Sequence, residues 1–434
     1  MALTRPLPRA LAAALACAAA AAAALPAAPS AAAGPAPAAP AAPVRTAADG
    51  TTAAVPGEQV SARARAAAAG SWIVTLKAAL QADSARGTQA AGRAGRDLVA
   101  RYGGTVRHVY GAALNGFSAR LDDDQARRLA ADPAVRSVHR DAVVHATADR
   151  AAGTATQAAP PSWGLDRIDQ QALPLDSAYR YPDTAGAGVT VYVVDTGVRT
   201  GHRDFGGRAS SGYDFVDGDA TAQDGNGHGT HVAGTAAGTA HGVAKRAAVV
   251  AVRVLDDAGS GTASDVVAGI DWVTAHARRP AVANLSLGGG ANADIDAAVR
   301  NSVAAGITYT VAAGNDGADA SGGSPARVRE ALTVGATARD DTRADYSDYG
   351  PAVDLFAPGS DITSDWASGD TATRTVSGTS MAAPHAAGAA ALYLAGHTGA
   401  SPAEVAAALT GAATGGRLAG VGSGSPDLLL RVTG

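Results

Sequence analysis

Runs of apolar, largely β-branched residues recur from residue 189 onward, separated by stretches with the composition of helices. A strand that is apolar on both faces must be covered on both faces, which is typical of a parallel sheet between two layers of helices. The alternation therefore predicts an α/β fold, with functional side chains beyond the carboxyl ends of the strands. The predicted strands cover residues 189–194, 249–254, 282–287, 308–312 and 331–334.

Composition limits the partners of this chain. Hydrophobic residues make up 47% of the 434 residues and aromatic residues only 4%, so the core must rest on Val, Leu, Ile and Ala. The formal net charge of -4 argues against a protein that binds polyanions. We therefore expect no nucleic-acid partner.

Residues 1–28 have the layout of a secretory signal peptide: two arginines, an apolar stretch over residues 11–25 and then small residues. A retained membrane span is the weaker alternative, because Pro26 interrupts the stretch. No later segment is apolar enough to cross a bilayer, so we expect no membrane association after export. The only cysteine, Cys17, lies inside this signal, and the exported protein would have no disulfide.

The rest of the chain divides into segments of different composition. Residues 29–70 are rich in Ala and Pro without periodicity, which predicts a disordered leader. Residues 71–147 show strand and helix patterns in the order β-α-β-β-α-β, typical of a small ferredoxin-like α+β domain. Residues 148–160 form a patternless linker, and residues 161–434 hold the parallel-sheet domain.

Three motifs place a chemically useful side chain at the end of a strand or the start of a helix. Asp195 ends the first apolar run, His228 lies in a glycine-rich loop, and Ser380 begins an alanine-rich helix. A serine becomes a nucleophile when a base takes its proton and a third group orients that base. For each residue taken alone, the alternative is structural: a turn aspartate, a loop histidine or a helix N-cap serine.

The order of these residues along the chain is Asp, His, Ser, which is the order in subtilisin and not that in chymotrypsin or the α/β-hydrolases. The three motifs, together with Leu285–Gly290 and Ala312–Asn315 between them, resemble the blocks of subtilisin-like serine proteases (peptidase S8), closest to the proteinase K branch. The 71–147 segment resembles the inhibitory I9-type propeptides of this family. An independent binding domain is the alternative for that segment.

The resemblance implies roles for particular residues. Asp195, His228 and Ser380 would form the catalytic triad, and the side chain of Asn315 with the backbone N–H of Ser380 would form the oxyanion hole. Small residues in the first specificity pocket imply broad specificity with a preference for apolar or aromatic P1 side chains. The residues implied in substrate binding are Gly259, Ser260, Gly261, Ser286, Leu287, Gly288, Ala312, Ala313 and Gly314.

Calcium is also implied by the resemblance. Asp354 matches a carboxylate ligand of the proteinase K-type site, with the backbone carbonyls of Arg329 and Ala331 as companions. For a second, weaker calcium site, a solvated acidic turn is an equal alternative. That second site would use Asp166, Asp169 and Gln170.

These features together predict a secreted serine endopeptidase that hydrolyses peptide bonds through an acyl-enzyme on Ser380 and is made as a zymogen that processes itself. Residues 143–146 would occupy the substrate cleft as an extended strand. The expected partners are protein or peptide substrates and the propeptide as an intramolecular inhibitor, with the protein a monomer. The alternatives are an esterase or transacylase with the same triad, and an inactive binding protein, which would need a damaged triad.

Overall fold

The computed structural model describes residues 66–77, 84–146, 150–152 and 160–432. The predicted signal peptide and most of the predicted leader lie outside these residues. Within them, no helix has the length and apolar character needed to cross a membrane.

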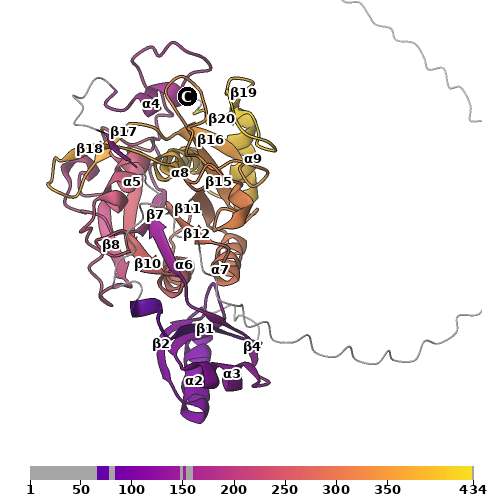
Figure 1. The fold of residues 1–434 in the computed structure, drawn as a ribbon. Coiled ribbons are helices and arrows are strands. Elements are labelled where there is room, and N and C mark those ends of the chain that lie inside the picture. Colours follow the sequence, from indigo (N-terminus) through magenta and orange to yellow (C-terminus); the bar gives the residue numbers. More distant parts are fainter. Residues whose placement is uncertain (1–65, 78–83, 147–149, 153–159, 433–434) are drawn as a thin grey trace, which may run out of the picture. The chain divides into compact units, whose positions relative to one another are not determined.

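The N-terminal domain has the predicted β-α-β-β-α-β order (Figure 1). Its antiparallel sheet has the strand order β2-β3-β1-β4, and the apolar sides of both helices share one core with the sheet. Asp122 and Gln125 form a capping box at the start of α3. The elements are β1 (Ser71–Leu76), α2 (Ser84–Tyr102), β2 (Thr105–Tyr110), β3 (Gly116–Arg120), α3 (Asp123–Ala130) and β4 (Val135–Arg140).

The second domain is built on a nine-stranded sheet with the order β19-β20-β16-β15-β13-β11-β7-β9-β8. All neighbouring strands are parallel except β19 and β20. The strands are β7 (Thr190–Asp195), β8 (Ala209–Asp214), β9 (Ala248–Arg253), β11 (Ala281–Leu285), β13 (Thr308–Ala312), β15 (Leu332–Thr337), β16 (Leu355–Pro358), β19 (Thr414–Gly415) and β20 (Leu428–Leu429).

Helices cover both faces of this sheet, as its strand composition predicts (Figure 1). One core joins a face of the sheet to the helices α5 and α8, and the other joins the opposite face to α6 and α7. The helices are α4 (Trp163–Ile168), α5 (His228–Ala237), α6 (Ala263–His276), α7 (Ala293–Ala304), α8 (Thr379–Gly396) and α9 (Pro402–Ala412), with short 3₁₀ turns η1 (Arg203–Phe205) and η2 (Ala320–Gly322).

Strand β7 marks the topological switch point, because the chain continues to β9 on one side of it and to β11 on the other. The carboxyl ends of parallel strands at such a point leave room for a site between the loops that follow them. Asp195 is the last residue of β7 and is fully buried. The fold therefore places the first predicted catalytic residue where sites of this architecture form.

The predicted strand 282–287 is wrong at its end. The ladder stops at Leu285, and Leu287 begins a separate strand, β12 (Leu287–Gly290). Ser286 lies between them, where its hydroxyl donates a hydrogen bond to the carbonyl of Ser380 over 2.8 Å. Two polar side chains, Asn284 and Ser286, thus lie within the predicted apolar run.

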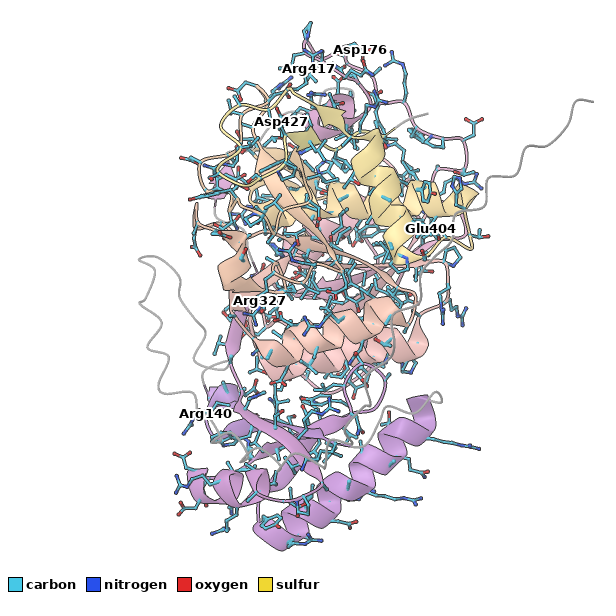
Figure 2. All side chains as sticks on the ribbon, turned by 90° about the vertical axis from the view of Figure 1, so that its right-hand side faces the viewer. Arg140, Asp176, Arg327, Glu404, Arg417 and Asp427 are labelled. Carbon is cyan, nitrogen blue, oxygen red and sulfur yellow. The ribbon has the colours of Figure 1, made fainter. Side chains whose placement is uncertain are left out.

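Helix α8 is buried along most of its length, including Ser380 and the interior Pro384. Its small residues allow close contact with α5: a Cβ on Gly388 would lie 2.7 Å from the carbonyl oxygen of Ala236 in that helix. The following helix α9, which carries the labelled Glu404 (Figure 2), begins with a capping box. In this box the side chains of Ser401 and Glu404 each accept the backbone N–H of the other residue.

Candidate active site

Asp195 and His228 meet at the end of β7 and the start of α5. His228 donates from Nδ1 to Oδ1 of Asp195 over 2.7 Å, and both side chains are buried. Burial lowers the pKa of His228, but the charge and hydrogen bond of Asp195 outweigh burial and raise it above the ordinary value. This bond leaves Nε2 of the ring as the nitrogen that can accept a proton.

Asp224 organises the loop in front of His228, a role that sequence analysis did not assign. Its carboxylate accepts hydrogen bonds from the backbone N–H groups of Asn226, Gly227 and Thr230. It also accepts the hydroxyl of Thr196, which in turn accepts the N–H of Gly229. Thr196, which follows Asp195, is thus linked to Gly229, which follows His228. This link fixes the Asp195 motif relative to the His228 motif. In the sequence, the signal for this role is the position of Asp224 directly before the turn sequence Gly-Asn-Gly, because aspartate side chains often accept backbone N–H groups in turns.

Ser380 lies in the first turn of α8, where backbone N–H groups point away from the helix. Its hydroxyl donates to the carbonyl of Ser286 over 3.1 Å, while Nε2 of His228 has no hydrogen bond to any described residue. Hydrogen bonds between a nucleophilic serine and its base are often long or poorly aligned before substrate binds.

The side chain of Asn315 is anchored beside Ser380. Its Oδ1 accepts hydrogen bonds from the N–H and the hydroxyl of Thr379, each 2.9 Å long. Because the oxygen is held on the Thr379 side, the amide Nδ2 points the other way. The structure therefore pairs Asp195 with His228 and Asn315 with the residue before Ser380, and the packing of α5 against α8 connects these two pairs.

Residues 143–146 form β5 (Val143–Ala146), which pairs antiparallel with two segments of the catalytic domain. These segments are β10 (Ser260–Thr262) and β12, which contain four of the nine residues predicted to bind substrate. The pairing confirms that this stretch adds as a strand between them. Ala146, at its end, lies opposite Leu287, directly after Ser286.

The predicted linker contains a second paired strand, β6 (Arg150–Ala152), which sequence analysis treated as patternless. It pairs with β18 (Thr373–Ser377), the strand that leads into Gly378 and Ser380. Strand β18 also pairs with β17 (Ile362–Asp365). The chain is thus held by strand pairing on both sides of residues 147–149.

The remaining predicted substrate-binding residues line the same region. Ala312 ends β13, and Ala313 and Gly314 follow it, with Gly314 bonded to the Thr379 hydroxyl through its N–H. Gly259 has a φ of 73°, a left-handed value that suits glycine, in the turn before β10.

Asp354, the predicted calcium ligand, is a partly buried carboxylate whose Oδ2 accepts the N–H of Thr333. Burial raises its pKa to about 6, although the positive charge of Arg329 opposes this rise. Ala331 precedes β15, the strand that pairs with β16 just after Asp354. A carboxylate whose charge is poorly compensated suits a cation with oxygen ligands.

The residues of the second predicted calcium site hold one loop together. Asp166 accepts the N–H of Ser177, Asp169 accepts the N–H of Arg180, and Gln170 donates to the carbonyl of Pro174. Oδ1 of Asp169 is buried and has no hydrogen bond to any described residue. The oxygen-rich loop fits calcium as well as it fits an acidic turn.

Comparison with known proteins agrees with this geometry. A family model described as the subtilase family (Peptidase S8) matches residues 186–425, and one described as peptidase inhibitor I9 matches residues 71–147. The extracellular serine proteinase of Thermus sp. (strain Rt41A) is 52% identical, over 76% of this chain and 78% of its own length. The alkaline serine exoprotease A of Vibrio alginolyticus is 47% identical, over 76% of this chain and 60% of its own length.

Among solved structures, the crystal structure of a cold-adapted subtilisin-like serine proteinase matches with a TM-score of 0.61 and 50% identity. The match covers 63% of this chain and 98% of that chain. The chain therefore belongs to the subtilase family of serine endopeptidases and carries an inhibitor I9 propeptide domain.

Proposed function

We propose that this protein is a secreted endopeptidase that hydrolyses peptide bonds through an acyl-enzyme on Ser380. The observation that carries the proposal is the 2.7 Å bond between His228 and Asp195 at the start of α5, a helix that packs against α8, whose first turn contains Ser380. The names of its relatives, an extracellular proteinase and an exoprotease, support export. No observation favours an esterase or a binding protein over this activity.

In the proposed mechanism, Nε2 of His228 takes the proton of Ser380 as Oγ attacks the scissile carbonyl carbon. The carbonyl oxygen becomes an oxyanion, which accepts hydrogen bonds from Nδ2 of Asn315 and the N–H of Ser380. When the intermediate collapses, the C–N bond breaks and His228 gives its proton to the leaving amine. Water then attacks the acyl-enzyme while His228 again takes a proton as the base. The second intermediate collapses, which releases the carboxylic acid product and returns the proton to Ser380.

The segments around β5 are proposed to bind substrate as they bind the propeptide. The antiparallel pairing of β5 with β10 and β12 uses backbone groups, so it tolerates many side chains. Small residues at Gly288, Ala312 and Gly314 would leave room for an apolar or aromatic P1 side chain. Broad specificity with this preference follows.

Calcium is proposed as a structural ion and takes no part in the reaction. Asp354 would hold it with the carbonyls of Arg329 and Ala331, and the loop of Asp166, Asp169 and Gln170 would hold a second ion. Bound calcium would neutralise carboxylates in a chain whose only cysteine lies in the predicted signal peptide.

The test compares purified parent protein with Ser380→Ala on casein, with and without a serine-directed fluorophosphonate. We expect only the parent to release fragments, and the reagent to stop it. The paired strands β5 and β6 predict self-cleavage between Ala146 and Arg150. Ser380→Ala should therefore remain full-length, and the mature parent should begin within this interval. Normal maturation of Ser380→Ala, or casein cleavage by it, would refute the proposal.

A further inference from the structure

A buried cluster of Asp204, His241 and Asp365 lies outside the residues used above. Asp204 is in η1, His241 is in the turn after α5, and Asp365 ends β17. One potential ligand atom from each lies within 4.8 Å of the others. The side chains of His241 and Asp365 are 4% and 0% exposed.

Hydrogen bonds satisfy Asp204, which accepts the backbone N–H groups of Ala240 and His241, but they do not satisfy Asp365. Nδ1 of His241 lies 3.1 Å from an oxygen of Asp204 and 3.1 Å from an oxygen of Asp365, and a ring nitrogen carries at most one hydrogen. Neither oxygen of Asp365 accepts a hydrogen bond from any described residue. A fully buried carboxylate without a donor is costly unless a cation compensates it.

His202 adds a lone pair to the same cluster. Its Nε2 faces the carbonyl of Ala372 over 3.0 Å, so that nitrogen must carry the hydrogen, and Nδ1 accepts the N–H of Asp204. This Nδ1 lies 3.5 Å from the second oxygen of Asp365. The lone pair on Nδ1 of His202 and an oxygen of Asp365 thus face each other where both side chains are buried.

The end of α5 makes the cluster more negative. The carboxylates of Asp204 and Asp365 lie against Gly238 and Gly234, in the last turn of this helix, where the helix dipole is negative. Arg208 lies nearby, but its Nη1 donates to the carbonyls of Ala237 and Ala247 instead of to either carboxylate. The helix end therefore adds to the negative potential at the cluster, and the nearby charges of Arg208 and Lys245 offset part of this potential.

We propose that Asp204, His241 and Asp365 bind a zinc ion, with His202 beside it. A tetrahedral ion with ligands at about 2.0–2.1 Å has ligand atoms about 3.3 Å apart, and the 3.1 Å and 3.5 Å separations in the cluster lie around this value. Imidazole nitrogen with carboxylate oxygen suits zinc, whereas calcium takes about 6–8 oxygens. Two carboxylates neutralise one divalent ion.

The ion would cross-link the segments that follow Asp195 and His228 to a strand that precedes Ser380. Segment η1 follows β7, which ends in Asp195, and His241 follows α5, which begins with His228. Asp365 lies on β17, whose partner β18 leads to Ser380. In an exported chain without cysteine, zinc would tie these segments together as a structural ion.

The test uses the full Ser380→Ala chain, which cannot digest itself, in excess calcium. We expect stoichiometric zinc by elemental analysis after dialysis. At a zinc concentration about 100-fold above Kd, Tm should rise by about 5 °C or more, and a zinc-selective chelator should reverse the rise. Asp365→Ala should lose both the bound zinc and the zinc-dependent rise in Tm.

Asp370→Ala is the matched control, because Asp370 follows β17 but is exposed and paired with Arg199. This variant should bind zinc as the parent does. If Asp365→Ala does not fold, Asp204→Asn should show the same loss of zinc. A proton on His241 is the competing counter-charge, since Asp204 and Asp365 overcome burial and raise its pKa to about 9. Folded parent without bound zinc, with Tm insensitive to zinc, would overturn the proposal.

Discussion

The hydrogen bond between His228 and Asp195 sets the expected pH dependence of catalysis. Only neutral His228 can take the serine proton, so kcat/KM should fall as pH drops through its raised pKa. Asp195→Asn removes the negative charge that raises the pKa of His228, so the acid limb of the pH profile should move to lower pH. The rate should also fall by about 10⁴-fold. The measurement is kcat/KM on a peptide substrate across the acid limb.

Asn315→Ala is the control for this experiment, because Asn315 does not titrate. Loss of its donor should lower kcat by about 10²–10³-fold and leave the acid limb in place. An acid limb unmoved in Asp195→Asn would contradict the assignment of His228 as the base.

At the residue scale, the sequence predicts the triad because each member sits among neighbours with a local signature. Asp195 ends an apolar run, His228 is flanked by glycines and Ser380 starts an alanine-rich helix. His241 and Asp365 have no such neighbours, and only the fold brings these distant positions together. Their cluster therefore could not be predicted from spacing.

The contact between α5 and α8 determines how closely His228 and Ser380 approach, since each begins one of these helices. A Cβ on Gly388 would meet Val243 at 2.5 Å and the carbonyl of Ala236 at 2.7 Å. Gly388→Ala should therefore push the helices apart and lower stability by about 1–3 kcal/mol. The measurement is Tm in the Ser380→Ala background.

Gly396→Ala is the matched change in the same helix, because a Cβ there would meet no atom within 4 Å. It should be neutral or slightly stabilising, since alanine favours a helix. Equal effects of the two substitutions would contradict the packing argument.

At the element scale, the longer apolar strands were predictable, whereas the short apolar β16 and the polar β8 were not. β7, β9, β13 and β15 match predicted runs within a few residues. β8 lies at the edge of the sheet and has the polar sequence Ala-Ser-Ser-Gly-Tyr-Asp, which carries no strand pattern. The early end of β11 depends on a tertiary contact of Ser286, which no local pattern encodes.

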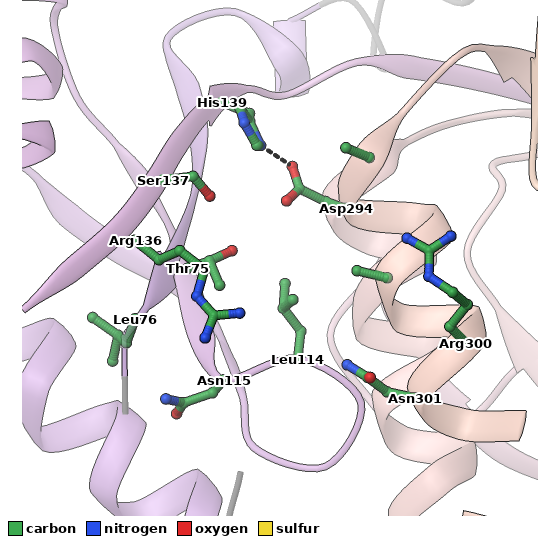
Figure 3. Close-up of a pocket in the computed structure, with 12 residues that line it drawn as sticks. Thr75, Leu76, Leu114, Asn115, Arg136, Ser137, His139, Asp294, Arg300 and Asn301 are labelled. Carbon is green, nitrogen blue, oxygen red and sulfur yellow. Dashed lines mark hydrogen bonds and ion pairs between the residues drawn. The ribbon is translucent and has the colours of Figure 1, made fainter. Parts of the chain in front are cut away.

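Across the whole molecule, the propeptide binds the catalytic domain through groups that hold protons more tightly in the complex. His139 bonds Asp294 over 2.8 Å, and this bond raises its pKa above the ordinary 6.5 although burial opposes it (Figure 3). Burial raises the pKa of Asp141 and of Asp271, which accepts backbone N–H groups of residues 111–114. Other charged groups at this contact are Arg107, His108 and Asp265.

These shifts predict that the cleaved propeptide dissociates faster as pH rises. When the pKa of a group is raised in the complex, that group stabilises propeptide binding fully at a pH below its ordinary pKa. This stabilisation is lost as the pH rises through the raised pKa. For His139 this window begins near pH 6.5. The side chain of His139 is 44% exposed, so solvent screening limits its contribution to the change in dissociation rate to about two- to fivefold. The measurement is the rate at which activity appears after self-cleavage, at about pH 6 and about pH 8.

His139→Gln should speed release at the lower pH and flatten the dependence over this window, because glutamine cannot gain the charge that Asp294 stabilises. His276→Gln is the matched control, since His276 bonds the carbonyl of Trp272 within its own helix. That variant should keep the pH dependence of the parent. Release that slows as pH rises, or a dependence unchanged in His139→Gln, would show that the His139–Asp294 pair does not couple propeptide binding to pH.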